Sequence, residues 1–240
     1  YDPSGYYLRK PWMIFWPFDE QMNLVGLQGM SYHGGLIGAV IGGLIYCKMK
    51  KFSFLHITDI AVAGIPLGYT FGRLGNFING ELWGRVTTSP IGMIFPYAPK
   101  YSTRHEWVRR IADQVGITYE SGEMVQLPRH PSQLYEAFFE GIVLWLVLWF
   151  VFRPRKKYNG QMLGIYLIGY GLVRFFIEYF REPDIGIGYP IQLGAEAYPQ
   201  ALYLSPWNFT TGQILCFLMI VGGGLLLWIQ KRRNRTPESG

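Results

Sequence analysis

Residues Gly72–Arg85 read GRLGNFINGELWGR, a stretch that combines two arginines, two asparagines and a glutamate with four glycines. It directly follows the apolar run Phe54–Phe71, so Arg73 lies where an ordinary membrane helix would still be apolar. A charge at mid-bilayer costs about 3 kcal/mol or more and usually marks a functional site. The alternative is an interfacial arginine that reaches lipid phosphates, with the glycines forming a turn. We interpret the stretch as the polar end of a membrane helix.

The composition of the chain favours a membrane protein. Half of the 240 residues are hydrophobic and only 16% are charged, against about 25% charged residues in an average soluble domain. The net charge of +6 and the pI near 9.2 would also suit nucleic-acid binding. However, the basic residues cluster at the ends of apolar runs, which is the positive-inside pattern. We therefore attribute the charge to membrane topology and expect no nucleic-acid partner.

Five apolar segments predict membrane-spanning helices, at residues 30–46, 54–78, 134–152, 162–180 and 212–229. Basic clusters follow the first, third and fifth segments and place those ends in the cytoplasm. Pro66, midway along the second segment, is expected to kink it because proline removes a backbone donor and crowds the preceding turn. The predicted fold is an all-α polytopic membrane protein, a helical bundle of about five spans with a cytoplasmic C-terminus.

The rest of the chain is expected to lie mainly on the outer side. The predicted organisation is an interfacial segment at 1–29, two spans at 30–78, the signature stretch and a small extracytoplasmic head at 79–132, two spans at 133–180, an outer loop at 181–211, and the last span with a basic tail at 212–240. A short helix is expected at 104–115, and a lid is one role for the outer loop. The charged residues of the head could have a functional role, and the alternative is that they only form a solvated surface.

The two cysteines are not expected to form a disulfide. Cys47 and Cys216 fall inside apolar runs at opposite predicted ends of their spans. No metal-ligand spacing, nucleotide loop or redox motif is visible in the sequence, so we expect no metal and no cofactor.

Polar residues from four parts of the chain are predicted to meet near the outer ends of the membrane spans, at one depth in the membrane. They are His33, Arg73, the stretch Asn76–Arg85, His130, Glu136, Arg174 and Glu178. Tyr170, Arg174 and Glu178 are spaced by four, so they share one helix face. Ionisable residues within a membrane normally face the bundle interior or a wet cavity. The alternative is that Arg174 and Glu178 form an i,i+4 pair that neutralises both.

Four strings, in order along the chain, carry a resemblance to a known family. They are Gly29–Gly35 (GMSYHGG), Gly72–Arg85, Arg129–Glu136 (RHPSQLYE) and Gly169–Asp184. Together they resemble the prolipoprotein diacylglyceryl transferases, bacterial membrane enzymes that lipidate a cysteine of secreted lipoprotein precursors. That family carries further membrane helices before this point, one of them with an active-site tyrosine. Because the chain begins at Tyr1 and shows no signal peptide, we expect it to be a piece of a longer protein.

The resemblance implies a reaction and its partners. The diacylglyceryl group of phosphatidylglycerol would move to the lipobox cysteine thiol of a prolipoprotein signal peptide, forming a thioether and releasing glycerol phosphate. The implied location is the bacterial plasma (inner) membrane, among membrane lipids, with the active site on the periplasmic side.

Such a reaction needs a thiolate and a group that holds the charge of the departing phosphate. A free thiol has a pKa near 8.5, so a base assists it, and His33 is the candidate catalytic base. The alternatives are that His33 has a structural role or that it binds the lipid headgroup. Arg73 and Arg174 are the candidate catalytic phosphate clamp, because arginine offers a fixed fork of donors. The predicted substrate-binding residues are Arg73, Asn76, Asn79, Glu81, Gly84, Arg85, His130, Glu136, Tyr170 and Glu178, with Gly84 shaping the backbone.

Other classes of membrane protein fit the sequence less well. A transporter for an anionic solute would use Arg73 and Arg174 as binding charges, but such proteins usually contain internal repeats and the sequence shows none. A structural subunit would not need so many ionisable groups at one depth. An intramembrane serine protease would need a serine motif paired with a placed histidine.

Overall fold

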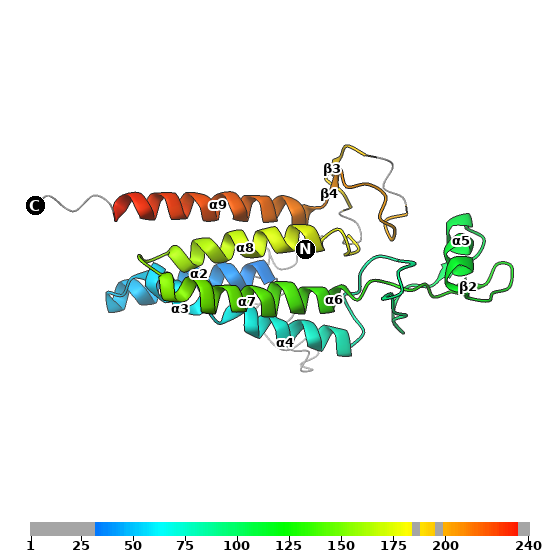
Figure 1. The fold of residues 1–240 in the computed structure, drawn as a ribbon, viewed down its shortest axis with the longest axis horizontal. Coiled ribbons are helices and arrows are strands. Elements are labelled where there is room, and N and C mark those ends of the chain that lie inside the picture. Colours follow the sequence, from blue (N-terminus) through cyan, green and yellow to red (C-terminus); the bar gives the residue numbers. More distant parts are fainter. Residues whose placement is uncertain (1–31, 184–187, 195–198, 235–240) are drawn as a thin grey trace, which may run out of the picture. The chain divides into compact units, whose positions relative to one another are not determined.

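The computed structural model describes residues 32–183, 188–194 and 199–234 (Figure 1). The chain forms two compact units, Tyr1–Phe54 and Leu55–Gly240. In the first unit, α2 (Tyr32–Lys50) ends with Lys48 and Lys50 in its last turn, where cations complement the helix dipole. The predicted interfacial segment 1–29 lies outside the described residues.

The second unit contains the remaining helices. They are α3 (Phe54–Val62), α4 (Ile65–Ile78), α5 (Glu106–Val115), a continuous helix Ser132–Arg155, α8 (Gln161–Ile177) and α9 (Thr211–Arg233). The continuous helix consists of α6 (Ser132–Tyr135), a π-helical stretch Glu136–Val143, α7 (Leu144–Leu146), a second π-helical stretch Val147–Phe152 and a 3₁₀ turn Arg153–Arg155. The helical class predicted from the sequence is confirmed.

A break separates α3 from α4. The two helices are bent by 46°. Gly64 precedes α4 and Pro66 lies in its first turn, where the missing N–H of proline costs no intrahelical bond. The predicted kink at Pro66 is therefore confirmed.

The predicted number of membrane spans is not confirmed. Among the described residues, Ser132–Arg155 and Thr211–Arg233 are long and apolar enough to cross a membrane, and α3 with α4 makes a third if the bent pair is one span. The apolar helix α8 has 17 residues and is shorter than a typical span. The helix α2 is not in this set, because its histidine and lysines lower its apolar character.

Small residues allow α8 and α9 to pack closely, and the two helices run side by side (Figure 1). A Cβ atom added to Gly164 would lie 2.7 Å from Leu227, and one added to Gly223 would lie 2.7 Å from the carbonyl oxygen of Gly164. Glycines at such positions let helix backbones approach. Close packing against α9 therefore supports the residues at the end of α8.

The start of α8 is capped by a side chain from α3. Asp59 is 3% exposed. Its carboxylate accepts hydrogen bonds from the backbone N–H groups of Gly160 (2.8 Å) and Leu163 (2.9 Å) and lies 3.0 Å from Lys156 Nζ. These N–H groups have no intrahelical acceptor, so Asp59 performs the task of an N-cap from another helix.

We expect Asp59→Asn to lower the free energy of unfolding by about 1–2 kcal/mol, because it removes the ion pair and one acceptor of the cap. The measurement is thermal or denaturant unfolding of the purified protein in detergent. An unchanged midpoint would contradict the capping role.

The polar insert between α4 and α6 contains a small mixed structure. Strand β1 (Tyr101–Ser102) pairs antiparallel with β2 (Met124–Val125), and α5 is followed by its C-cap Gly116, which has φ +74°. The helix predicted at 104–115 is thus found at 106–115. A hydrophobic cluster holds these elements together, formed by Val86, Val108, Ile111, Ala112, Val125, Leu127 and Ala201.

The outer loop contributes to that cluster. Ala201 lies in it, Leu202 packs against it, and the N–H of Val86 donates to the carbonyl oxygen of Ala201 at 2.9 Å. Strands β3 (Ile191–Gln192) and β4 (Asn208–Phe209) of the loop pair with each other. The role of a lid stays a prediction.

Candidate functional site

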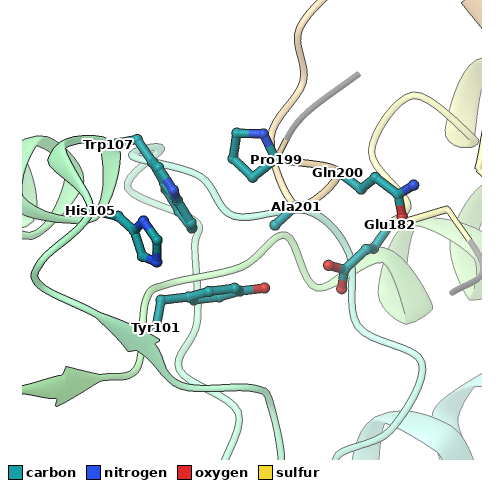
Figure 2. A pocket seen from close by; sticks show the side chains of 7 residues that line it. All are labelled: Tyr101, His105, Trp107, Glu182, Pro199, Gln200 and Ala201. Atoms are coloured by element: carbon teal, nitrogen blue, oxygen red, sulfur yellow. The ribbon is translucent and has the colours of Figure 1, made fainter. Parts of the chain in front are cut away.

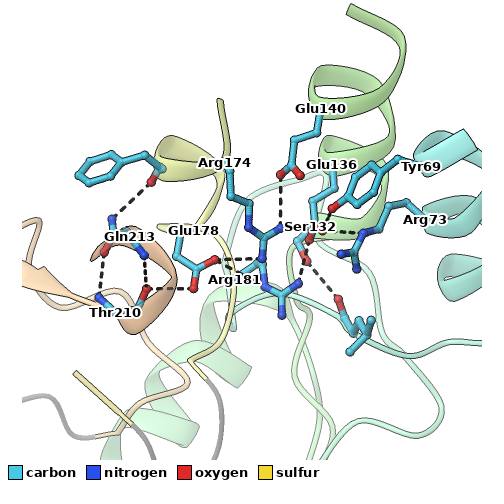
Figure 3. A network of polar contacts seen from close by, with 12 residues as sticks. Tyr69, Arg73, Ser132, Glu136, Glu140, Arg174, Glu178, Arg181, Thr210 and Gln213 are labelled. Atoms are coloured by element: carbon cyan, nitrogen blue, oxygen red, sulfur yellow. Dashed lines mark hydrogen bonds and ion pairs between the residues drawn. The ribbon is translucent and has the colours of Figure 1, made fainter. Parts of the chain in front are cut away.

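Three helices bring six charged side chains together inside the second unit (Figure 3). α4 supplies Arg73, the π-helical stretch supplies Glu136 and Glu140, and α8 with the residues after it supplies Arg174, Glu178 and Arg181. Glu136 and Glu140 are 0% exposed and Glu178 is 8% exposed. We call these six residues the ion cluster.

Glu136 contacts four side chains. Its Oε2 lies 2.9 Å from Arg73 Nε and 2.8 Å from Arg174 Nη1, and it accepts a hydrogen bond from the Tyr69 hydroxyl at 3.0 Å. Its Oε1 lies 3.3 Å from Arg181 Nη1. Two guanidinium groups from α4 and α8 therefore converge on one carboxylate oxygen.

Arg174 contacts three carboxylates. Besides Glu136, its Nη1 donates to Glu140 Oε1 at 3.3 Å, and its Nη2 lies 3.2 Å from Glu178 Oε2. The i,i+4 pair that the sequence left open as an alternative is thus present, as one contact of a larger cluster. Because several ion pairs hold the guanidinium, its orientation is fixed before any ligand arrives.

Glu178 is also held from α9. Its Oε1 accepts from the hydroxyl of Thr210 at 3.0 Å, and Thr210 forms a capping box with Gln213 at the start of α9. A Cβ atom on Gly212 would lie 2.8 Å from the same carboxylate oxygen, so a larger residue there would displace the Glu178 carboxylate.

The ion cluster is electrically balanced. Three guanidinium groups face three carboxylates, and buried charges are tolerated only when they are paired in this way. Aromatic rings border the cluster: the Arg73 guanidinium lies 4.7 Å from the centre of the Tyr69 ring, and the ring centres of Tyr69 and Tyr170 are 6.1 Å apart. An anion can bind the guanidinium groups of such a cluster only by taking the place of a carboxylate.

The loop after α4 forms a second polar group. Glu81 Oε1 accepts hydrogen bonds from Asn76 Nδ2 (2.8 Å), in the last turn of α4, and from Asn79 Nδ2 (3.3 Å). Asn79 and Glu81 are exposed, and Asn76 is half-buried. Gln133, which is fully buried, donates to the carbonyl oxygen of Glu81 at 2.6 Å. The loop is therefore tied to the beginning of the helix that carries Glu136.

Gly84, Arg85 and His130 form a backbone junction with the end of α8. Gly84 N–H donates to the His130 carbonyl, Arg85 N–H donates to the Phe180 carbonyl, and His130 N–H donates to the Arg85 carbonyl, each at 2.9 Å. The Arg85 side chain is 3% exposed and donates to the Tyr189 hydroxyl and to the carbonyl of Leu202 at 3.0 Å. In this structure Arg85 thus anchors the outer loop.

His130 lies among aromatic side chains beside a hollow of about 400 Å³. Its Nδ1 is 3.1 Å from the Tyr135 hydroxyl, and its ring centre is 5.1 Å from that of Phe180. Burial lowers the pKa of His130 below its ordinary value of 6.5, because desolvation disfavours the charged imidazolium.

This shift predicts a dependence of stability on pH. The folded protein binds the His130 proton more weakly than the unfolded chain does, so unfolding becomes easier as the pH falls below about 6.5 and levels off below the folded-state pKa. We expect His130→Gln to reduce the difference between the unfolding midpoints at pH 7.5 and pH 5.5. His105→Gln, at an exposed histidine of the head, is the matched control. Equal pH dependence in wild type and His130→Gln would contradict the prediction.

A second hollow of about 390 Å³ lies between the insert and the outer loop (Figure 2). It is lined by Tyr101, His105, Trp107, Glu182, Pro199, Gln200 and Ala201. Two of these lining residues contact the fully buried Arg129, which pairs with Glu182 Oε2 at 2.6 Å and donates to the Tyr101 hydroxyl at 2.5 Å and to the Gly84 carbonyl at 3.0 Å. Burial raises the pKa of Tyr101. Arg129 thus links three parts of the chain.

The structure brings together only some of the predicted site residues. Arg73, Glu136, Arg174 and Glu178 belong to one cluster, with Tyr170 beside it. The predicted residues Asn76, Asn79 and Glu81 form the second group, and Gly84, Arg85 and His130 form the junction. His33 lies in α2, in the first unit, and its side chain is not among those that the structure describes. The role of His33 therefore stays a prediction.

Sequence reasoning missed three members of the site, Tyr69, Glu140 and Arg181. Glu140 follows Glu136 by four residues within an apolar segment, and a second charge on the same helix face was a usable signal. Arg181 follows Arg174 by seven residues, close to two helical turns, so it also lies near the same face. Nothing in the pattern around Tyr69 distinguishes it from other membrane tyrosines.

Metal and disulfide chemistry find no support in the part of the chain that the structure describes. There, no group of three or more histidine, cysteine, aspartate or glutamate side chains is placed to hold a metal ion. Cys47 and Cys216 are both buried free thiols.

Comparison with known proteins gives a consistent result. The family model described as prolipoprotein diacylglyceryl transferase matches residues 4–229. Relatives named phosphatidylglycerol–prolipoprotein diacylglyceryl transferase include one from Treponema denticola, 51% identical, with 99% of this chain and 73% of the relative covered. One from Treponema pallidum is 54% identical (93% and 68% covered), and one from Chlorobaculum tepidum is 48% identical (88% and 59% covered).

Proposed function

The chain belongs to the prolipoprotein diacylglyceryl transferase family and is a transferase, and we propose that it moves the diacylglyceryl group of phosphatidylglycerol to the lipobox cysteine of a prolipoprotein. The observation that carries the proposal is the convergence of Arg73 and Arg174 on one carboxylate oxygen. The alternative of an anion transporter finds no support among the relatives.

In the proposed reaction the cysteine sulfur attacks the glycerol carbon that bears the phosphate. A carbon–sulfur bond forms, the carbon–oxygen bond breaks, and the electron pair stays on the phosphate oxygen. The product is a thioether and the leaving group is glycerol phosphate. Negative charge therefore grows on the phosphate in the transition state, and donors already aimed at that charge lower the barrier.

Arg73 and Arg174 are proposed to supply those donors. Guanidinium groups stay charged and match two oxygens of a phosphate. Glu136 Oε2 occupies the point at which both groups meet, and a phosphate oxygen carries similar charge and accepts the same hydrogen bonds. The lipid phosphate is thus proposed to take over the contacts of Glu136, which keeps its partner Arg181.

The remaining predicted residues are proposed to serve binding and proton transfer. His33 is the proposed base for the thiol. The amides and carboxylate of Asn76, Asn79 and Glu81 suit the hydroxyl groups of the lipid headgroup. Gly84, Arg85 and His130 are proposed to shape the entrance, and Tyr170 and Glu178 to border the clamp. We propose that the site faces the periplasmic side of the inner membrane.

A direct transfer assay tests the proposal. Membranes that contain the natural full-length protein are mixed with phosphatidylglycerol carrying labelled acyl chains and with a lipobox peptide. We expect mass spectrometry to find a diacylglyceryl thioether on the peptide cysteine, and no product from the Cys→Ser peptide. Absence of the thioether with the cysteine peptide would overturn the proposal.

A further inference from the structure

Glu140 has an unusual environment for a carboxylate. Its side chain is 0% exposed, its Oε1 accepts from Arg174 Nη1 at 3.3 Å, and its Oε2 is buried without a hydrogen-bond partner. An apolar side chain in its place would avoid the cost of desolvation, and replacing buried ionic groups in this way is often neutral or stabilising. A buried, incompletely satisfied charge inside an apolar helix therefore calls for a functional explanation.

The contacts of Arg174 supply that explanation. Its Nη1 carries two hydrogens, and this nitrogen has two carboxylate partners, Glu136 Oε2 at 2.8 Å and Glu140 Oε1 at 3.3 Å. If the lipid phosphate takes the place of Glu136, one of these bonds is exchanged and the other remains. Glu140 is then the carboxylate that still holds Nη1 (Figure 3).

The other two carboxylates of the ion cluster have further partners. Glu136 also binds Arg73, Arg181 and Tyr69, and Glu178 also binds Arg181 and Thr210. Glu140 lies one helical turn beyond Glu136, in the π-helical stretch Glu136–Val143. Such widened turns are frequent at functional sites.

We propose that Glu140 is a positioning residue for the transfer reaction: it fixes the Arg174 guanidinium while the lipid phosphate occupies the place of Glu136. This inference rests on the proposed function, because it assigns Arg174 to the phosphate. Glu140 itself makes no contact with substrate. Glu140 is expected to affect mainly the transition state, in which the negative charge on the phosphate has grown. A guanidinium that tilts away weakens its interaction with the phosphate most in that state.

The first test is the kinetics of Glu140→Gln, which keeps the shape of the side chain and removes its charge. We expect kcat to fall by about tenfold or more, the loss typical of a hydrogen bond to a charged group. The KM for phosphatidylglycerol is expected to change less than about threefold, because ground-state binding also uses Arg73. Asp59→Asn is the matched control, a buried carboxylate that caps α8, and its kcat per folded enzyme is expected to stay unchanged.

The second test is a double-mutant cycle, which distinguishes a positioning role that acts through Arg174 from a merely structural role. Because Glu140 acts through Arg174, Glu140→Gln is expected to cause little further loss of kcat in an Arg174→Lys background, whereas independent effects would multiply. Multiplying effects, or full activity of Glu140→Gln, would overturn the inference. If Glu140→Gln fails to fold, Glu140→Asp, which keeps the charge but shortens its reach, replaces it in the same cycle, with the same two outcomes.

The cycle also separates this inference from the proposed function. Full activity of Arg174→Lys would overturn the assignment of Arg174 to the phosphate, and the inference would fall with it. A strong loss in Arg174→Lys combined with multiplying effects of Glu140→Gln would overturn the positioning role alone.

Discussion

Arg174→Lys is expected to lower kcat by about a hundredfold or more, the cost of removing a donor aimed at transition-state charge. Lysine keeps the positive charge but replaces the planar fork with a compact point charge. It therefore cannot contact Glu136, Glu140 and Glu178 with the same geometry and still offer donors to a phosphate. The measurement is the initial rate of transfer to a lipobox peptide at saturating lipid.

The control for Arg174→Lys is the same substitution at a surface arginine with defined hydrogen bonds. Arg109 Nη1 donates to the carbonyl oxygens of Thr103 (2.8 Å) and Arg104 (3.0 Å) in the head. Arg109→Lys is expected to leave turnover unchanged. A folded Arg174→Lys enzyme with turnover close to that of wild type would refute the assigned role.

Gly84→Ala is expected to lower the free energy of unfolding by about 3 kcal/mol, at the upper end of the usual cost of overpacking, and to abolish most of the activity. The added methyl group would lie 2.8 Å from the carbonyl oxygen of His130 and still closer to that of Phe180. Relief of these clashes requires separating the strand-like segments that hold Arg181 beside Gly84. The measurements are the yield of folded protein, its unfolding midpoint and its transfer rate.

Gly224→Ala is the matched control for this loss. Gly224 lies in the middle of α9, and a Cβ atom there would meet nothing within 4 Å. Because alanine favours helices by roughly 1 kcal/mol over glycine, this variant is expected to be neutral or slightly more stable. A Gly84→Ala protein with the unfolding midpoint of Gly224→Ala would contradict the packing argument.

The sequence predicts the helices and offers the i,i+4 pair of Arg174 and Glu178 as an alternative, because both depend on short-range patterns. Apolar runs define the segments, proline marks the break at Pro66, and the spacing of Arg174 and Glu178 places them on one face. The short helix of the head was located within two residues at its start. These features need no knowledge of how distant segments pack.

The features that the sequence did not reveal depend on contacts between distant residues. The sharing of Arg174 Nη1 by Glu136 and Glu140 depends on how α8 packs against the Ser132–Arg155 helix. The carbonyl contacts of Arg85 depend on a loop more than a hundred residues away. The span count stays unconfirmed for a different reason, since the hydropathy of α2 and the length of α8 lie near the limit for a membrane helix.

The presence of Ala201 in the hydrophobic cluster of the head has a consequence for biogenesis. That cluster also needs Val86 and Val108, so its members are separated in the chain by the Ser132–Arg155 helix and α8. Contacts of such large sequence separation form late, because the intervening chain must first be ordered. During synthesis the head therefore stays incomplete until the ribosome has passed residue 201, and a head fragment cut from the chain at residue 132 would expose part of its core to water and aggregate.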